Sequence, residues 1–194
     1  MPKKLLSKEM IVEEALNFID DYGYEAFSLR GLARRLSVQV SSLYNYINNE
    51  DGLMVEVVRR AVCMFTECID NARGELFRDE AAFATADAFR SFVQEYPNLY
   101  EVIVNPKWAN APELKQVNEK FIRPIFVLLK QYGIEDGEEQ VHMMRIIRVA
   151  THGFCSLEMV GAFGEDSASI TQSYHLLSQS VVDLMNKYSK EKDG

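Results

Sequence analysis

Two short amphipathic segments that meet across a two-residue break constrain this chain more than any other feature. Ser28 precedes the first segment and is a plausible N-cap, and Ser37-Val38 separates it from the second. The apolar residues that recur at helical spacing on the two segments are Leu29, Leu32, Ala33, Leu36, Val38, Leu43 and Ile47. A break this short forces a large angle between the two helices, which is the geometry of a helix-turn-helix unit.

Helical periodicity continues through the rest of the chain, and no run of alternating β-branched residues is sustained. The first helix is expected to start after Ser7 and to stop at Gly23, and Asn48 or Asn49 is expected to cap the fourth. The second and third helices are predicted to carry the apolar residues from Leu29 to Leu36 and from Val40 to Ile47, and the fourth to run to about Asn71. Further helices are predicted at about 79–95, 97–104, 112–132, 137–163 and 168–188. The sequence therefore predicts an all-α protein. An N-terminal three-helix helix-turn-helix domain (residues 1–50) is joined by a long helix to a helical-bundle ligand-binding and dimerisation domain (residues 51–194).

The net charge of −8 by itself disfavours nucleic acid as a partner, but the charges are unevenly distributed along the chain. Between Phe27 and Asn48 every charged residue is an arginine, namely Arg30, Arg34 and Arg35. A basic island on an acidic chain is typical of a protein that contacts DNA with one small module. The alternative is that these arginines only solvate a helix face.

The second helix of the unit carries an outward surface of polar and aromatic residues. These residues are Gln39, Val40, Ser41, Ser42, Tyr44, Asn45 and Tyr46. In helix-turn-helix proteins the second helix enters the major groove while the first crosses the backbone. Short hydroxyls can approach bases or phosphates there, and the tyrosines can hydrogen-bond phosphate while they pack on sugar. We therefore expect this surface to contact double-stranded DNA.

The stretch from Phe27 to Ile47, followed by Asn48-Asn49-Glu50-Asp51-Gly52-Leu53, resembles the DNA-binding domain of TetR-family regulators. The resemblance extends over roughly Lys8 to Val62. It implies that Arg30, Val40, Ser41 and Ser42 face bases or nearby sugar, and that Ser28, Tyr44 and Tyr46 contact the backbone. Asn45 lies between the two tyrosines and completes the predicted DNA-binding residues. The segment from Arg148 to Phe163 is similar to the His-Gly-containing effector-domain helix of one TetR subgroup.

Two positions depart from the family pattern. The family commonly has glycine where this chain has Ser37, and serine in a left-handed turn costs on the order of 1 kcal/mol. It also commonly has lysine at the start of the fourth helix, where this chain has Glu50. Glu50 suits the helix dipole but repels phosphate, so DNA affinity is expected to be weaker or differently anchored.

The last two long helices carry stripes whose spacing alternates between four and three residues. Such stripes suit helices packed at a shallow angle in a four-helix bundle between two subunits. The predicted homodimer interface consists of Ala150, Gly153, Leu157, Val160, Ile170, Tyr174, Leu177, Val181 and Leu184. The alternative is that both stripes face only the core of their own subunit.

Large adaptable side chains between the module and this interface predict a site for a small apolar or amphipathic effector. Most of these side chains belong to the ordinary core, and a subset is expected to line the ligand. The predicted pocket residues are Met64, Phe65, Phe89, Phe92, Tyr100, Phe121, Met144, Arg148 and His152. Thr151 and Cys155 are further polar groups on the helix that holds Arg148 and His152.

Other functional classes have weaker support in the sequence. The three histidines are too scattered for a metal site, no cofactor or catalytic motif occurs, and the pair His152 and Cys155 alone does not indicate an enzyme. Redox sensing through Cys63, Cys68 or Cys155 stays open, as does a helical ligand-binding module without DNA binding. No apolar run is long enough to span a membrane, no signal peptide is visible, and the scattered cysteines favour the cytoplasm.

Overall fold

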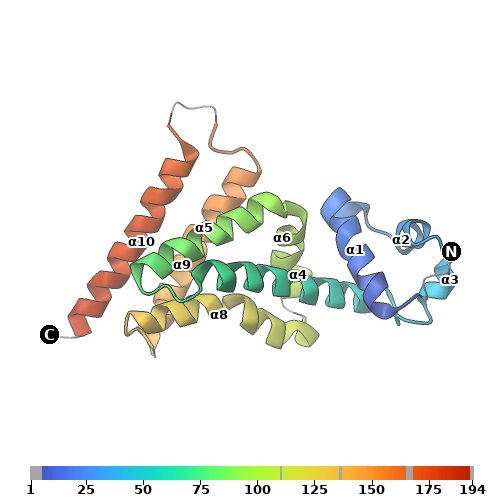
Figure 1. Ribbon diagram of the computed structural model, residues 1–194, viewed down its shortest axis with the longest axis horizontal. Coiled ribbons are helices and arrows are strands. Elements are labelled where there is room, and N and C mark those ends of the chain that lie inside the picture. The colour runs from blue at the N-terminus through green and yellow to red at the C-terminus, as the bar shows by residue number, and fades with distance from the viewer. Residues whose placement is uncertain (1–5, 110, 136, 165–167, 193–194) are drawn as a thin grey trace. The chain divides into compact units, whose positions relative to one another are not determined.

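A computed structural model describes residues 6–109, 111–135, 137–164 and 168–192 (Figure 1). The described residues form ten α-helices and two short 3₁₀ helices, with no strand among them. The predicted all-α class is therefore confirmed. None of the helices in the described ranges is both long and apolar enough to cross a membrane.

The chain divides into two compact units that are not continuous in sequence. Unit 1 consists of residues 1–64 and 96–118, and unit 2 of residues 65–95 and 119–194. This division differs from the predicted boundary at residue 50. The first part of the long fourth helix and a later stretch of chain both belong with the N-terminal helices.

Unit 1 is built from short helices whose ends are fixed by local hydrogen bonds. Ser7 caps the first helix by accepting a hydrogen bond from Met10 N at 3.2 Å, and Gly23, at φ 80°, stops it with a bond from its N–H to Ile19 O. Its elements are α1 (Lys8–Tyr22), η1 (Tyr24–Ala26), α2 (Leu29–Arg35), α3 (Val40–Leu43), the first part of α4 (Glu50–Arg73), α6 (Pro97–Val104), α7 (Pro106–Ala109), η2 (Pro112–Leu114) and the start of α8 (Lys115–Gln131).

The later stretch of unit 1 packs directly on its N-terminal helices. Asn98 Nδ2 on α6 donates a 2.7 Å hydrogen bond to Asp20 O on α1. Trp108 on α7 is buried and meets the Tyr24 ring edge-on at 6.3 Å. Arg59 on α4 donates to Glu113 O at 3.2 Å. Residues 96–118 therefore form part of the structure that supports the helix-turn-helix.

Unit 2 contains the rest of α4 and α8 with α5 (Asp79–Glu95), α9 (Glu138–Met159) and α10 (Ile170–Lys192). Its core joins α5, α8, α9 and α10 through one cluster of buried side chains. The cluster consists of Ala81, Ala82, Leu128, Leu129, Tyr132, Ile134, Met143, Ile147, Val182 and Met185. Alanines on α5 allow close approach of the neighbouring helices, and larger residues on the other three helices fill the space.

The predicted helix boundaries agree with the structure except at short elements and helix ends. Helices 79–95 and 97–104 were predicted with the observed bounds, but η1 and α7 were missed because three or four residues show no period. The third helix ends at Leu43 and continues as a turn to Ile47. The helix predicted over 137–163 ends at Met159, and the last helix extends to Lys192.

Candidate nucleic-acid interface

The helix-turn-helix begins with a tight approach between α1 and α2. Ser28 Oγ accepts a 3.1 Å hydrogen bond from Gly31 N and so caps α2. A Cβ at Gly31 would lie 2.8 Å from the Phe18 ring and 3.1 Å from Ser28 Oγ. Glycine at this position therefore lets the first turn of α2 lie against α1 while the cap stays in place.

The turn between α2 and α3 depends on Ser37 in the left-handed region, at φ 56°. Val38 N then donates to Ala33 O at 2.9 Å, which closes the end of α2. The expected left-handed conformation of Ser37 is thus confirmed. A serine side chain is disfavoured in this conformation, so the turn stores a local strain.

We expect Ser37→Gly to raise the free energy of unfolding by about 1 kcal/mol, because glycine adopts this φ without a Cβ clash. Urea denaturation followed by circular dichroism measures the change. Ser41→Gly, in the helical α3, is the matched control and should lower stability by roughly 0.5–1 kcal/mol. A Ser37→Gly protein no more stable than wild type contradicts the strain argument.

The predicted DNA-contacting side chains of α3 lie on its exposed surface. Leu43 and Ile47 are buried beneath it, whereas Tyr44 is 53% exposed and Tyr46 38% exposed. Ser41 and Asn45 are also exposed, and Val40 and Ser42 are half-buried. The helix-turn-helix core therefore takes the aliphatic residues and leaves the hydroxyl and amide groups outside.

The three arginines of the basic island differ in their partners. Arg35 forms ion pairs with Glu14 and with Asp21, the latter at 2.7 Å, and these carboxylates raise the pKa of its guanidinium. Arg30 and Arg34 are exposed and form no ion pair with any described residue. Two of the three positive charges are thus available to a phosphate backbone, and the third holds α2 to α1.

The start of α4 is acidic, as its sequence indicates. Asn49 caps it, with Oδ1 accepting a 2.7 Å hydrogen bond from Gly52 N, and Glu50 and Asp51 occupy its first turn. Lys107 pairs with Asp51 at 2.7 Å. Of the two predicted caps, Asn49 is therefore the one used, and Glu50 is left exposed.

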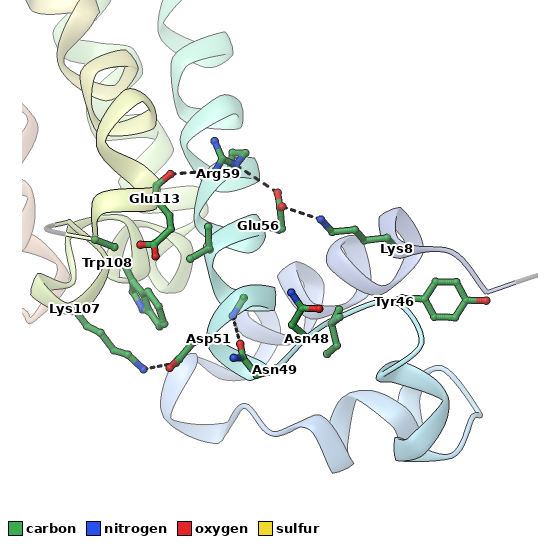
Figure 2. Close-up of a pocket in the computed structure, with 14 residues that line it drawn as sticks. Lys8, Tyr46, Asn48, Asn49, Asp51, Glu56, Arg59, Lys107, Trp108 and Glu113 are labelled. Atoms are coloured by element: carbon green, nitrogen blue, oxygen red, sulfur yellow. Dashed lines mark hydrogen bonds and ion pairs between the residues drawn. The ribbon is translucent and has the colours of Figure 1, made fainter.

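A groove of about 640 Å³ lies beside this helix start, within unit 1 (Figure 2). Its cations are held by carboxylates, since Glu56 binds Lys8 at 2.9 Å and Arg59 at 3.4 Å. Tyr46 also lines the groove but points away from these pairs in Figure 2. The groove cations are engaged within the protein, which leaves α3 with Arg30 and Arg34 as the surface suited to DNA.

Comparisons with known proteins agree with this geometry. The family model described as "Tetracyclin repressor-like, C-terminal domain" matches residues 82–181. The uncharacterised HTH-type transcriptional regulator Rv0681 of Mycobacterium tuberculosis is 30% identical over 161 residues, which cover 82% of this chain and 73% of the relative. This chain belongs to the TetR family.

Two further comparisons cover nearly the same span. The uncharacterised HTH-type transcriptional regulator YobS of Bacillus subtilis is 27% identical over 84% of this chain and 84% of its own length. Apo ActR from Streptomyces coelicolor has a similar structure, with a TM-score of 0.69 at 16% identity over 96% of this chain and 98% of that one. The structural similarity supports the TetR fold.

The two helices predicted to form the TetR dimer interface differ in what they expose. On α9, Val149 is 73% exposed, Val160 75% and Leu157 48%. Ala150 and Gly153 are half-buried on the same side, and space is open around Gly153. This apolar surface of α9 is named the α9 face below.

Three residues of the α10 stripe predicted for the interface pack on their own unit. Tyr174 is 2% exposed, and its hydroxyl donates a 2.6 Å hydrogen bond to Ala86 O on α5. Val181 and Leu184 pack on the core cluster of unit 2, and Ile170 and Leu177 are half-buried. Tyr174, Val181 and Leu184 therefore face the core of their own unit, which was the alternative interpretation of the stripe. The four-and-three spacing fits a core helix and a subunit interface equally well, so it did not separate the two. Leu176 of α10, which is not among the predicted residues, is 60% exposed.

The predicted effector residues do not form a single group. Met64 and Tyr100 belong to unit 1 and the others to unit 2. Four of the latter pack together, with the Phe65 ring centroid 5.3, 5.2 and 4.7 Å from those of Phe89, Phe92 and Phe121. Met144 packs against the core cluster. The aromatic residues thus form one cluster in unit 2.

The polar residues of α9 are placed differently from the prediction. Arg148 and His152 lie on the exposed side of the helix. The ring of His152 is still partly desolvated by its neighbours, and this desolvation, followed by the charge of Arg148, lowers its pKa. Thr151 Oγ1 hydrogen-bonds Ile147 O at 2.9 Å and so caps no ligand. The helix buries Met143, Ile147 and Cys155 instead, and a role of Arg148 and His152 in ligand binding stays a prediction.

Burial also bears on the redox and enzyme alternatives. Cys155 is buried, and desolvation raises the pKa of its thiol to about 12. Burial raises the pKa of Cys68 as well. Few thiolates form under these conditions, and the thiolate is the reactive species. The thiol of the His152 and Cys155 pair is therefore unreactive.

Proposed function

We propose that this TetR-family protein is a transcriptional regulator that binds a pseudo-palindromic DNA operator as a homodimer and is released by a small amphipathic ligand. The observation that carries the proposal is the α3 surface. In the turn that follows α3, Tyr44, Asn45 and Tyr46 are exposed while Leu43 and Ile47 are buried beneath them. Two arginines without carboxylate partners among the described residues lie on the adjoining α2. Its partner, chromosomal DNA, places the protein in the cytoplasm.

The α9 face supports the dimer. Exposed valines and leucines on one side of a long helix are costly in water, and a second copy of the same surface removes them from it. A two-fold dimer presents two α3 helices to successive major grooves, about 34 Å apart. One helix-turn-helix binds weakly, so the dimer supplies the required affinity.

DNA retention tests the proposal directly. Immobilised wild-type protein should retain genomic DNA fragments at low salt, and Tyr44→Ala/Tyr46→Ala should release them, with affinity at least 10-fold lower because backbone contacts are lost. Tyr22→Ala, an exposed tyrosine on α1, is the matched control and should retain the fragments. Salt should weaken retention, since phosphate contacts release counterions.

The acidic start of α4 favours a second candidate, a helical ligand-binding module without DNA binding. Glu50, which forms no ion pair with a described residue, repels phosphate at a helix start next to the α3 surface. If neither wild type nor the double variant retains DNA at any salt concentration, the second candidate replaces the first.

A further inference from the structure

Two arginines of unit 2 share a single carboxylate. Arg73, at the end of α4, lies 2.8 Å from Asp70 Oδ1, and Arg123, on α8, lies 3.6 Å from Asp70 Oδ2. The Arg73 side chain is 11% exposed and that of Arg123 is 60% exposed. One carboxylate between two guanidinium groups leaves an uncompensated positive charge where α4 meets α8.

The buried arginine is also incompletely hydrogen-bonded. Arg73 Nη1 is inaccessible to water and has no acceptor among the described residues. A buried donor on a charged group without a partner is unfavourable, and such groups are rare in folded proteins unless they serve an ion or ligand. The arrangement at Arg73 is therefore suited to an additional anion.

A second polar atom without a partner lies on the neighbouring helix. Thr85 Oγ1 on α5 is buried and has no hydrogen bond within the described part of the chain. Phe65 on α4 faces Phe89 and Phe92 on α5, and the helices run antiparallel through the short 74–78 connection.

An apolar region accompanies this charge on the same helix. The aromatic cluster of Phe65, Phe89, Phe92 and Phe121 begins eight residues before Arg73, which corresponds to about 12 Å along an α-helix. Buried Ile69 lies between them. Along α4, unit 2 thus has the two arginines at one end and a buried aromatic cluster about two turns away.

We propose that unit 2 binds an amphipathic anion, with its carboxylate or phosphate head on Arg73 and Arg123 and its apolar part directed toward the aromatic cluster. Guanidinium groups bind such heads through paired, charge-assisted hydrogen bonds. Asp70 holds the two arginines in the unliganded protein and competes with the ligand head. The inference rests on the proposed function, since it names the chemical class of the effector.

Titration calorimetry with three twelve-carbon probes below their micellar concentrations tests the head group. Dodecanoate and dodecyl phosphate carry the anion, whereas 1-dodecanol has the same chain without charge. We expect at least one anionic probe to bind wild type 10-fold or more tightly than 1-dodecanol, and the stronger one identifies the preferred head. Equal binding of all three, or no binding of any, overturns the proposal.

Variants test the assigned arginines. Arg73→Met keeps an apolar side chain and should lower the affinity for the anionic probe at least 10-fold, while the affinity for 1-dodecanol is unchanged. Arg123→Gln should lower the affinity for the anionic probe several-fold. Asp70→Asn should raise this affinity because the competing carboxylate is gone. Lys120→Gln, an exposed cation one turn earlier on α8, is the control and should bind as wild type does.

The outcomes separate this inference from DNA binding. If Arg73→Met does not fold, the exposed Arg123→Gln and the Asp70→Asn variant carry the test, and unchanged affinity in both overturns the site. The retention assay on the same wild-type protein reports on DNA independently. Retained DNA with no anionic preference refutes only the effector class, and anion binding without DNA retention refutes only the regulator.

Discussion

We expect Val149→Asp to convert the proposed dimer to a monomer and to lower affinity for a palindromic operator by about 100-fold or more. Val149 is 73% exposed on the α9 face, so an aspartate there is well solvated in the isolated chain and does not disturb its core. In the proposed dimer the symmetry places the new carboxylate in the interface twice. Burying two unpaired charges outweighs the apolar contacts that they replace.

Light scattering coupled to size-exclusion chromatography measures the first effect, against a chain mass of 22.2 kDa. Fluorescence anisotropy with a labelled operator measures the second. Phe77→Asp makes the same type of change at another exposed apolar residue, on the connection before α5, and should remain dimeric. If the Val149→Asp protein elutes at the same volume as the wild type, the α9 face is not the dimer interface.

We expect Glu158→Ala to lower the free energy of unfolding by about 3 kcal/mol, because it leaves the Arg90 guanidinium without its counter-charge. Arg90 on α5 binds both Glu158 oxygens on α9, at 2.9 and 2.6 Å, and also donates to Thr171 Oγ1 at 3.2 Å. The side chains are only 13% and 16% exposed, so water cannot replace the lost partner well. Arg90 also lies over the Tyr174 ring at 5.2 Å.

Chemical denaturation at neutral pH measures this loss, and Glu67→Gln, an exposed acid on α4, should change stability by no more than about 0.5 kcal/mol. Hydrogen bonds from Arg90 lower the pKa of Glu158. The stabilisation from the pair is therefore complete above the ordinary carboxyl pKa and is lost as pH falls through the lowered one. Glu158→Ala should lack this acid-dependent component, and an unchanged acid profile contradicts the assignment.

The helix-turn-helix could be predicted from sequence because each of its signals is local. Caps at Ser7 and Ser28, the stop at Gly23 and the left-handed Ser37 depend on neighbours within a few residues. The α3 surface followed from the same short period. Arg35 was misjudged because its partners, Glu14 and Asp21, are brought to it only by the packing of α1 on α2.

The interface and effector predictions depended on long-range packing, and there the sequence was ambiguous. A four-and-three stripe on α10 fits a partner subunit or the core equally well, and Tyr174 is drawn inward by its hydrogen bond to Ala86 O on α5. The shared carboxylate of Arg73 and Arg123 joins two helices that are far apart in sequence. Spacing along one helix carries no signal for either arrangement.

The discontinuous make-up of unit 1 limits how regulators of this kind can exchange their parts. A hybrid cut at residue 50 would carry Asp20 and Tyr24 but would lose Asn98 and Trp108, which they contact. The transplanted N-terminal helices would then pack on the α6 and α7 side chains of the recipient protein. Recombination that preserves function must therefore move residues 96–118 together with the N-terminal helices, although more than thirty positions separate them along the chain.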